Sequence, residues 1–258
     1  MDPARLQEWY ALVPGLMLIL ARIGALFAAA PVLGGPSIPA PVKALLTLAI
    51  GLLLLPQVAP RPVPMDALFL LSVAREVGVG LCLGFVLNLY IQGIKMGGEL
   101  INRHAGFNAA ENFDPDSDLG AGPMGDLLQL GAVLLFLALD GHLHLIASIA
   151  RSFAVVPLAG AHLTPESLGI VTHAVAESWA IALTLSFPVL TAVMAITVAE
   201  GVITRAVPQI NIMSISFAIK IGVSVAVVFA GMPAVVAFIG SVLGIMQAVT
   251  GPLITSLR

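Results

Sequence analysis

The sequence predicts an all-α protein built from hydrophobic, membrane-associated helices. Apolar residues make up 59% of the 258 residues, and only 10% of the residues are charged. An ordinary soluble domain carries about 25% charged residues, so this chain has too few polar side chains to coat a folded surface. Uncharged stretches of spanning length recur along the chain, and a helix satisfies its own backbone groups in hydrocarbon. These observations exclude a soluble monomer and a disordered chain.

We expect about six to seven helical segments, arranged as bent or kinked hairpins. The first apolar segment follows Asp2, Arg5 and Glu8 rather than a purely basic stretch, so we expect it to be retained rather than cleaved as a signal peptide. Gly231-Met232-Pro233 interrupts the last apolar run and predicts that two helices meet there. The uncharged runs cover residues 44–60, 77–94, 127–139, 178–199, 206–219 and 221–257.

Two of the expected helices are too long for a simple bundle. A helix from Asp66 to His104, which no proline interrupts, would rise by roughly 57 Å, whereas the hydrocarbon core is about 30 Å thick. Residues 165–205 have a similar excess length, with Pro188 as the expected position of a kink. Such helices either project beyond the bilayer or fold back as hairpins.

Residues 106–126 form an acidic segment between two apolar helices. The segment contains five acidic and no basic residues. A solvated loop is the simplest interpretation. A calcium loop is disfavoured because Gly120 stands one place too late after the three alternating aspartates and Gly125 occupies the twelfth position. The third interpretation is a flexible plug or gate, formed by Gly106, Phe107, Asn108, Glu111, Phe113, Asp114, Pro115, Asp116, Asp118 and Gly120.

Eight charged residues stand out beside or within the apolar helices. Lys95, Glu99 and Arg103 follow one another at intervals of four, so they share one helix face, either as an exposed charge ladder or facing a partner or a water-filled path. Interhelical pairing is the simplest interpretation of the others, with inter-subunit or pore-lining positions as the alternative. These others are Arg22, Glu177, Glu200, Arg205 and Lys220.

No residue pattern points to catalysis or to a bound cofactor. The sequence contains no nucleophile elbow, phosphate-binding loop or metalloprotease motif. Asp140, His142 and His144 favour a helix cap or turn over a zinc site, because residue 142 points away from the other two on a helix. The net charge of −3, without a basic block, argues against nucleic-acid binding. We therefore expect no enzyme activity, no cofactor and no metal.

Short motifs follow one another in a fixed order along the chain. Pro208, Gln209 and Asn211, followed by Lys220, resemble the PQ(L/I)N…K signature of the FliR/SctT family of type III export-gate subunits. Shorter matches run in order through about residues 5–255: Arg22 with Ala30-Pro31, Ile38-Pro39 with Lys43, Gly98-Glu99-Leu100-Ile101, Phe113-Asp114-Pro115, and Leu134-Leu135-Phe136 with Gly141-His142. Asp140 departs from the family, which usually has Asn there.

The resemblance implies a non-enzymatic, pore-forming subunit that translocates unfolded flagellar proteins. It implies partners of the FliP, FliQ, FlhB and FlhA types, contact with membrane lipid, and a place in the basal body at the inner membrane, raised toward the periplasm. It also implies one subunit over residues 1–258, with a FliP-like part at about 1–180 and a FliQ-like hairpin at about 181–258. The acidic segment would form the plug, and Pro208, Gln209 and Asn211 would form a helix joint.

Two alternatives remain open from the sequence. The first is an injectisome homologue of the SctT type, which shares the signature. The second is a small secondary transporter or proton channel, which would rest on the carboxylates Glu99, Glu177 and Glu200. A transporter would be expected to carry inverted repeats, and none is visible in this sequence.

Overall fold

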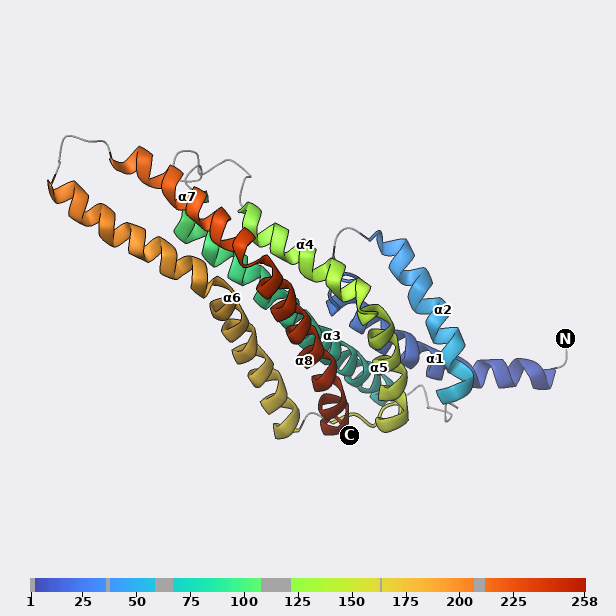
Figure 1. Cartoon of the computed structure of the whole chain (residues 1–258). Coiled ribbons are helices and arrows are strands. Elements are labelled where there is room, and N and C mark those ends of the chain that lie inside the picture. The colour runs from blue at the N-terminus through green and yellow to red at the C-terminus, as the bar shows by residue number, and fades with distance from the viewer. Residues whose placement is uncertain (1–2, 36–37, 59–66, 108–121, 163, 207–211) are drawn as a thin grey trace. The chain divides into compact units, whose positions relative to one another are not determined.

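The expected all-helical architecture is confirmed in the part of the chain that the structure describes. The computed structural model describes all residues except 1–2, 36–37, 59–66, 108–121, 163 and 207–211 (Figure 1). Within those limits it contains eight helices and no strand. The helices are α1 (Pro3–Ala29), α2 (Ala40–Val58), α3 (Ala67–Ala105), α4 (Pro123–Ala138), α5 (Gly141–Val155), α6 (Pro165–Ala206), α7 (Ile212–Ala230) and α8 (Met232–Ser256).

The two long helices expected from the sequence are present. Helix α3 runs for 39 residues without a proline, and α6 runs for 42 residues with Pro188 inside it. Figure 1 shows a bend part-way along α6, as expected for a proline that removes one backbone hydrogen bond. The last apolar run is divided at Gly231, as predicted, because α7 ends at Ala230 and α8 begins at Met232.

Five of the described helices are long and apolar enough to cross a membrane. These segments are Leu12–Ala29, Ala40–Val58, Phe69–Ala105, Pro165–Ala206 and Met232–Ser256, and α4 and α5 together give a sixth if they count as one bent span. Only 11% of the α2 segment is buried inside the chain. An apolar helix with so little internal burial requires lipid or protein on its outer face.

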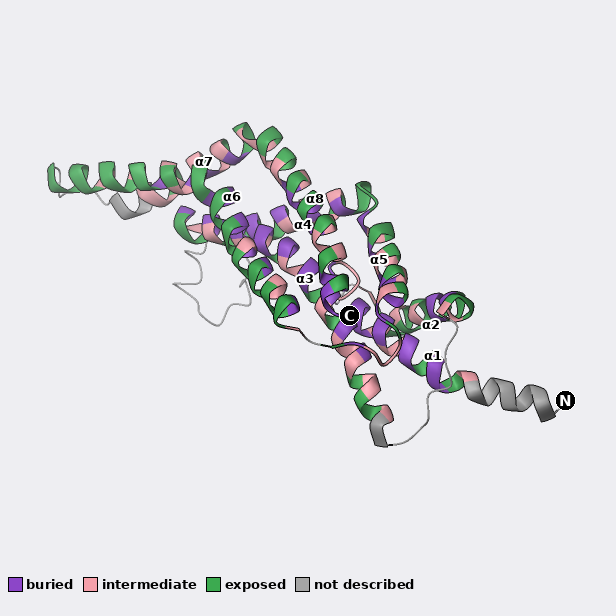
Figure 2. Ribbon diagram, turned by 90° about the horizontal axis from the view of Figure 1, so that it is seen from below, coloured by how far each residue is buried: buried purple, intermediate pink, exposed green. Residues whose placement is uncertain are grey.

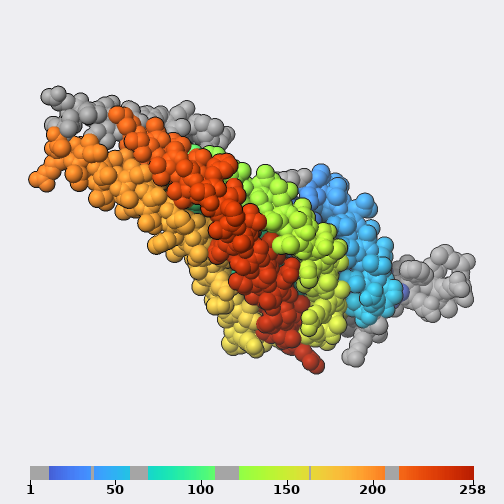
Figure 3. All heavy atoms as spheres, in the orientation of Figure 1, coloured from blue at the N-terminus to red at the C-terminus, as the bar shows by residue number. Residues whose placement is uncertain are grey.

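The chain divides into two compact units. Unit 1 comprises Met1–Leu89, Leu137–Val175 and Ile245–Arg258, and unit 2 comprises Tyr90–Phe136 and Ala176–Gly244. Unit 1 therefore holds α1, α2, α5, the first half of α3, the start of α6 and the end of α8. On the face drawn in Figure 3, the red end of α8 lies between the yellow start of α6 and the yellow-green α5.

The core of unit 1 forms where α1 packs closely on α3. Gly80 of α3 lies against the backbone oxygen of Arg22, and a Cβ on Gly84 would lie 2.7 Å from the backbone oxygen of Leu26. Glycines four residues apart on one helix face allow two helix backbones to approach this closely. Gly80 and Gly84 therefore permit the close contact between α1 and α3.

Unit 2 repeats this packing between α3 and α6. A Cβ on Gly93 would lie 2.7 Å from the backbone oxygen of Ser178, and a Cβ on Gly97 would lie 3.0 Å from that of Ala182. Ser178 and Ala182 are four residues apart on α6, as Gly93 and Gly97 are on α3, so one face of α6 runs along one face of α3. Beyond this contact α6 is largely exposed, as the green colour of its C-terminal half shows (Figure 2).

Candidate gate region and buried polar network

Two closely packed glycines of unit 2, Gly106 and Gly122, lie on either side of residues 108–121 of the acidic segment. Gly106 follows α3 with φ +85°, a left-handed conformation that glycine adopts without strain at a helix end. A Cβ on Gly106 would lie 2.7 Å from Cδ1 of Phe217, which belongs to α7. Gly122, where the described chain resumes, lies directly against the side chain of Asn102. The segment therefore leaves and rejoins the helices at two positions that have no room for a side chain.

Asn102 connects α3 to the start of α4. Its side chain is buried, and Oδ1 accepts a hydrogen bond of 3.0 Å from the backbone N–H of Met124. Met124 is the second residue of α4, so Asn102 satisfies one of the N–H groups that a helix start leaves without a partner. Among the described residues, Nδ2 of Asn102 is buried without a hydrogen-bond partner. Sequence analysis missed Asn102, because the contact depends on the tertiary structure.

Several residues singled out in the sequence lie outside the described part. Gly106 and Phe107 are described and half-buried, at the exit from α3. The expected joint falls between the end of α6 at Ala206 and the start of α7 at Ile212. The interpretations of these residues therefore stay predictions: Asn108, Glu111, Phe113, Asp114, Pro115, Asp116, Asp118 and Gly120 in the acidic segment, and Pro208, Gln209 and Asn211 at the joint.

The charged face of α3 lies beside α4. Nζ of Lys95 is 3.8 Å from Oδ1 of Asp126, and the Lys95 and Asp126 side chains are 27% and 56% exposed. Glu99 and Arg103, one and two turns further along, are exposed. Asp126 lies in the first turn of α4, not in the loop that its position in the acidic segment suggested. This ion pair is weak and exposed, so it leaves the face of α3 that carries Lys95, Glu99 and Arg103 open to water or to a partner.

The charges of α6 and α7 pair across these two helices. Nζ of Lys220 lies 3.0 Å from Oε2 of Glu200, and both side chains are mostly buried. Arg205, in the last turn of α6, is exposed and stabilised there by the carbonyl end of the helix. Glu177 accepts a hydrogen bond of 2.5 Å from the hydroxyl of Tyr90 on α3. The expected interhelical pairing is therefore found for Glu200 and Lys220.

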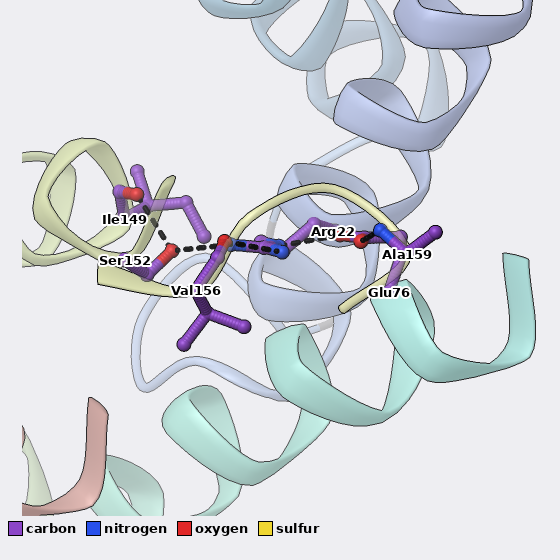
Figure 4. A network of polar contacts seen from close by, with 6 residues as sticks. All are labelled: Arg22, Glu76, Ile149, Ser152, Val156 and Ala159. Carbon is purple, nitrogen blue, oxygen red and sulfur yellow. Dashed lines mark hydrogen bonds and ion pairs between the residues drawn. The ribbon is translucent and has the colours of Figure 1, made fainter. Parts of the chain in front are cut away.

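A second polar cluster, the Arg22 network, lies in the core of unit 1 (Figure 4). Nε of Arg22 donates to Oε2 of Glu76 at 2.5 Å, and neither side chain is exposed. Nη1 donates to the hydroxyl of Ser152, and Nη1 and Nη2 both donate to the backbone oxygen of Val156, each at 3.2 Å. The guanidinium also lies 4.3 Å from the ring centre of Phe153. Arg22 thus joins α1 to α3 and to the end of α5.

The network extends into the segment that follows α5. Oε1 of Glu76 accepts a 2.8 Å hydrogen bond from the backbone N–H of Ala159, whose φ of +63° is unusual for a residue with a side chain. Nη1 of the neighbouring Arg75 donates to the backbone oxygen of Ala159 at 3.2 Å. Arg75 and Glu76, which are consecutive in α3, therefore bind the backbone oxygen and the backbone N–H of Ala159.

The arrangement of the Arg22 network suits a fixed joint rather than a proton relay. Arg22 has its charge balanced by Glu76, and an arginine stays protonated in proteins. Sequence analysis identified Arg22 but missed Glu76, which is 54 residues away. A single carboxylate near the start of a long apolar helix was the available signal, because such a charge needs a partner in a membrane protein.

The described residues show no metal cluster. No three histidine, cysteine, aspartate or glutamate side chains in the described part of the chain come close enough together to hold a metal ion. Asp140 has φ +55° and precedes α5 in the turn after α4, which confirms the expected helix cap or turn. Together the fold and these contacts define a helical membrane protein in which several of the described charges join one helix to another.

Comparison with known proteins identifies the family. Residues 13–246 match the family described as bacterial export proteins, family 1. The chain belongs to this family. It is 28% identical over 233 residues to the flagellar biosynthetic protein FliR of Escherichia coli (strain K12), a match that covers 90% of this chain and 89% of that relative.

Other relatives carry the same name. The FliR protein of Pectobacterium carotovorum subsp. carotovorum is 30% identical over 210 residues, which cover 79% of this chain and 78% of the relative. The FliR protein of Bacillus subtilis (strain 168) is 26% identical over 217 residues, which cover 83% and 84%. The resemblance found from short motifs is therefore confirmed over most of the chain.

Proposed function

We propose that this chain is a non-enzymatic subunit of the flagellar type III protein export gate. The single observation that carries the proposal is the family match over residues 13–246. The relatives compared above are flagellar proteins by name, which favours a flagellar role over an injectisome role. The chain would be located in the bacterial inner membrane at the flagellar basal body, with the gate raised toward the periplasm.

In this proposal the subunit assembles with FliP and FliQ homologues and works with FlhB and FlhA homologues. The exposed apolar face of α6 supports the need for partners, because Phe187, Val198 and Val202 are each 66–67% exposed. Residues 1–180 would form the FliP-like part and residues 181–258 the FliQ-like hairpin. Lys95, Glu99 and Arg103 would face either a neighbouring subunit or the water of the channel.

The acidic segment would close the channel at rest and move aside for an unfolded substrate. Close packing at Gly106 and Gly122, which lie on either side of residues 108–121, supports this proposal. The acidic side chains of the segment would resist burial in lipid, so a water-lined pore suits them better than a bilayer. Pro208, Gln209 and Asn211 would form the joint between α6 and α7.

The assembly proposal is tested by co-expression. The tagged chain is produced with the FliP and FliQ homologues of the same genome, extracted in detergent, and the purified particle is weighed by native mass spectrometry. We expect one particle that contains all three chains. A well-folded monomer that leaves both homologues behind would contradict assembly.

The export proposal is tested in the source bacterium. The gene is deleted, and a constitutively produced flagellar export substrate is measured in the medium and in the cells. We expect the substrate to stay inside the cells until the wild-type gene is supplied again. Normal secretion by the deletion strain would overturn the export proposal, whatever the state of assembly.

A further inference from the structure

Unit 1 contains a pocket next to the Arg22 network, and Arg75 contributes to both. Its volume is about 330 Å³. Arg75 and Gly78 of α3, His162 of the segment after α5, and Leu257 beyond the end of α8 contribute to its wall. The rest of the wall is apolar or small, formed by Ala74, Val79 and Ala161. The pocket therefore combines two basic side chains with an apolar surface.

The pocket lies beside the ends of two candidate membrane spans and near the start of a third, Phe69–Ala105, which contains the wall residues of α3. The span Met232–Ser256 finishes and the span Pro165–Ala206 begins beside it. Hydrogen bonds tie these ends together: the hydroxyl of Thr164 donates to the oxygen of Ser256 at 2.8 Å, and the N–H of His162 donates to the oxygen of Leu257 at 3.2 Å. The span Met232–Ser256 is close in length to the thickness of the hydrocarbon core, so we expect its end to lie near the lipid phosphates.

Arg75 contacts a neutral group rather than a carboxylate in the part of the chain that the structure describes. One N–H group of its side chain donates to the backbone oxygen of Ala159. The adjacent carboxylate of Glu76 is already shared between Arg22 and the N–H of Ala159. Within the described ranges Arg75 forms no ion pair, and Glu166 at the start of α6 is exposed and is not part of the pocket wall.

We propose that this pocket binds the phosphate group of an anionic phospholipid. The planar fork of an arginine presents several N–H groups to a phosphate, and the bond to Ala159 holds the Arg75 fork in place. His162 supplies a second donor at the pocket wall. Val79, Ala161 and Leu257 provide an apolar surface for the glycerol and the first acyl carbons. Free phosphate would gain nothing from that apolar surface.

Lipid retention by the full-length chain tests the proposal. The chain, with any subunits that co-purify, is incubated in detergent with equal amounts of phosphatidylglycerol and phosphatidylcholine of identical acyl chains, and retained lipid is identified by native mass spectrometry. We expect phosphatidylglycerol to be retained about fivefold over phosphatidylcholine, the factor typical of one arginine near an anionic surface. Millimolar inorganic phosphate should not displace the lipid.

Three variants locate the site. Arg75→Gln should abolish the preference for phosphatidylglycerol. Gly78→Leu should reduce retention of both lipids, because Gly78 belongs to the pocket wall and a leucine there would occupy part of the pocket. A Cβ on Gly78 meets nothing within 4 Å, so we expect the bond of Arg75 to Ala159 to stay intact. Arg151→Gln, at an exposed arginine of α5 outside the pocket, should retain the wild-type preference.

Several results would overturn the proposal. One is a wild-type chain without preference between the two lipids, and another is an equal loss in Arg75→Gln and Arg151→Gln, which indicates general surface attraction. Displacement by inorganic phosphate would assign the pocket to a soluble anion instead. If Arg75→Gln fails to fold, full lipid retention by Gly78→Leu still contradicts the proposal. None of these outcomes bears on assembly or export.

Discussion

Nε of Arg22 and Oε2 of Glu76 lie 2.5 Å apart with both side chains fully buried, so a charged pair joins α1 to α3 inside an otherwise apolar core. The same two helices approach closely at Gly80, which lies against the backbone oxygen of Arg22. The charge of Arg22 is therefore balanced at the point where the helix backbones meet. A core of this kind tolerates the loss of both charges better than the loss of one.

Glu76→Gln should destabilise the chain by about 3–5 kcal/mol, because it leaves the Arg22 charge buried without a counter-charge. In the wild-type chain a carboxylate oxygen of Glu76 accepts the hydrogen bond from the N–H of Ala159, and the variant places an uncharged amide group there instead. The double change Arg22→Met with Glu76→Leu should recover much of the loss. Thermal unfolding of the purified protein in detergent measures all three forms. A melting temperature of Glu76→Gln equal to wild type would refute a stabilising role for the pair.

Gly84→Ala should destabilise the α1–α3 contact by about 1–3 kcal/mol, the usual cost of overpacking. The added methyl group would lie 2.7 Å from the oxygen of Leu26 and 2.9 Å from Cβ of Ala29. Gly169→Ala on α6 is the matched control, since a methyl group there meets nothing within 4 Å. The control should be neutral or more stable by up to about 1 kcal/mol, because alanine favours helices. Equal melting shifts in the two variants would argue against close packing at Gly84.

Glu200→Lys should destabilise the α6–α7 hairpin, because it places two ammonium groups where Lys220 now lies 3.0 Å from a carboxylate oxygen. We expect a cost of about 2 kcal/mol or more, which is below the cost for a fully buried pair because both side chains keep some exposure. The exchange Glu200→Lys with Lys220→Glu should restore most of the stability. Yield of the purified complex and its melting temperature report the effect. If the exchanged pair is no more stable than Glu200→Lys alone, loss of the Glu200–Lys220 ion pair does not explain the destabilisation.

Asn102→Ala should destabilise the start of α4 by about 1–3 kcal/mol, since it leaves the N–H of Met124 without its buried acceptor. Asn102→Asp keeps an acceptor oxygen at the same place and adds a negative charge at a helix start, which is favourable there. The aspartate variant should therefore retain more stability than the alanine variant. Hydrogen exchange at the first residues of α4 distinguishes the aspartate variant from the alanine variant. Equal exchange rates in both variants would contradict a capping role for Asn102.

The sequence predicted the features that depend on local composition. Apolar runs predicted the helices, and the absence of proline between Asp66 and His104 predicted the uninterrupted α3. Gly231 followed by Pro233 predicted the division between α7 and α8, because proline cannot continue the hydrogen bonding of the preceding turn. Short motifs in a fixed order were sufficient to indicate the family.

Contacts between distant residues could not be predicted in the same way. Glu76 becomes the partner of Arg22 only because Gly80 allows α1 and α3 to touch. Ala159 adopts a left-handed conformation because Arg75 and Glu76 hold its two backbone groups, and nothing in an alanine signals this. Asp126 was assigned to a loop by charge alone, although Pro123 in the first position of α4 is a common helix start.

We propose above that this chain is a channel subunit whose acidic segment closes the export gate. Ion conductance tests this proposal most directly. The purified complex is reconstituted into planar bilayers as wild type, with residues 107–118 deleted, and with the same residues replaced by glycine and serine at equal length. The account predicts that both altered complexes assemble and conduct ions at rest while the wild-type complex stays closed. Assembled variants that are as tight as wild type would contradict the account.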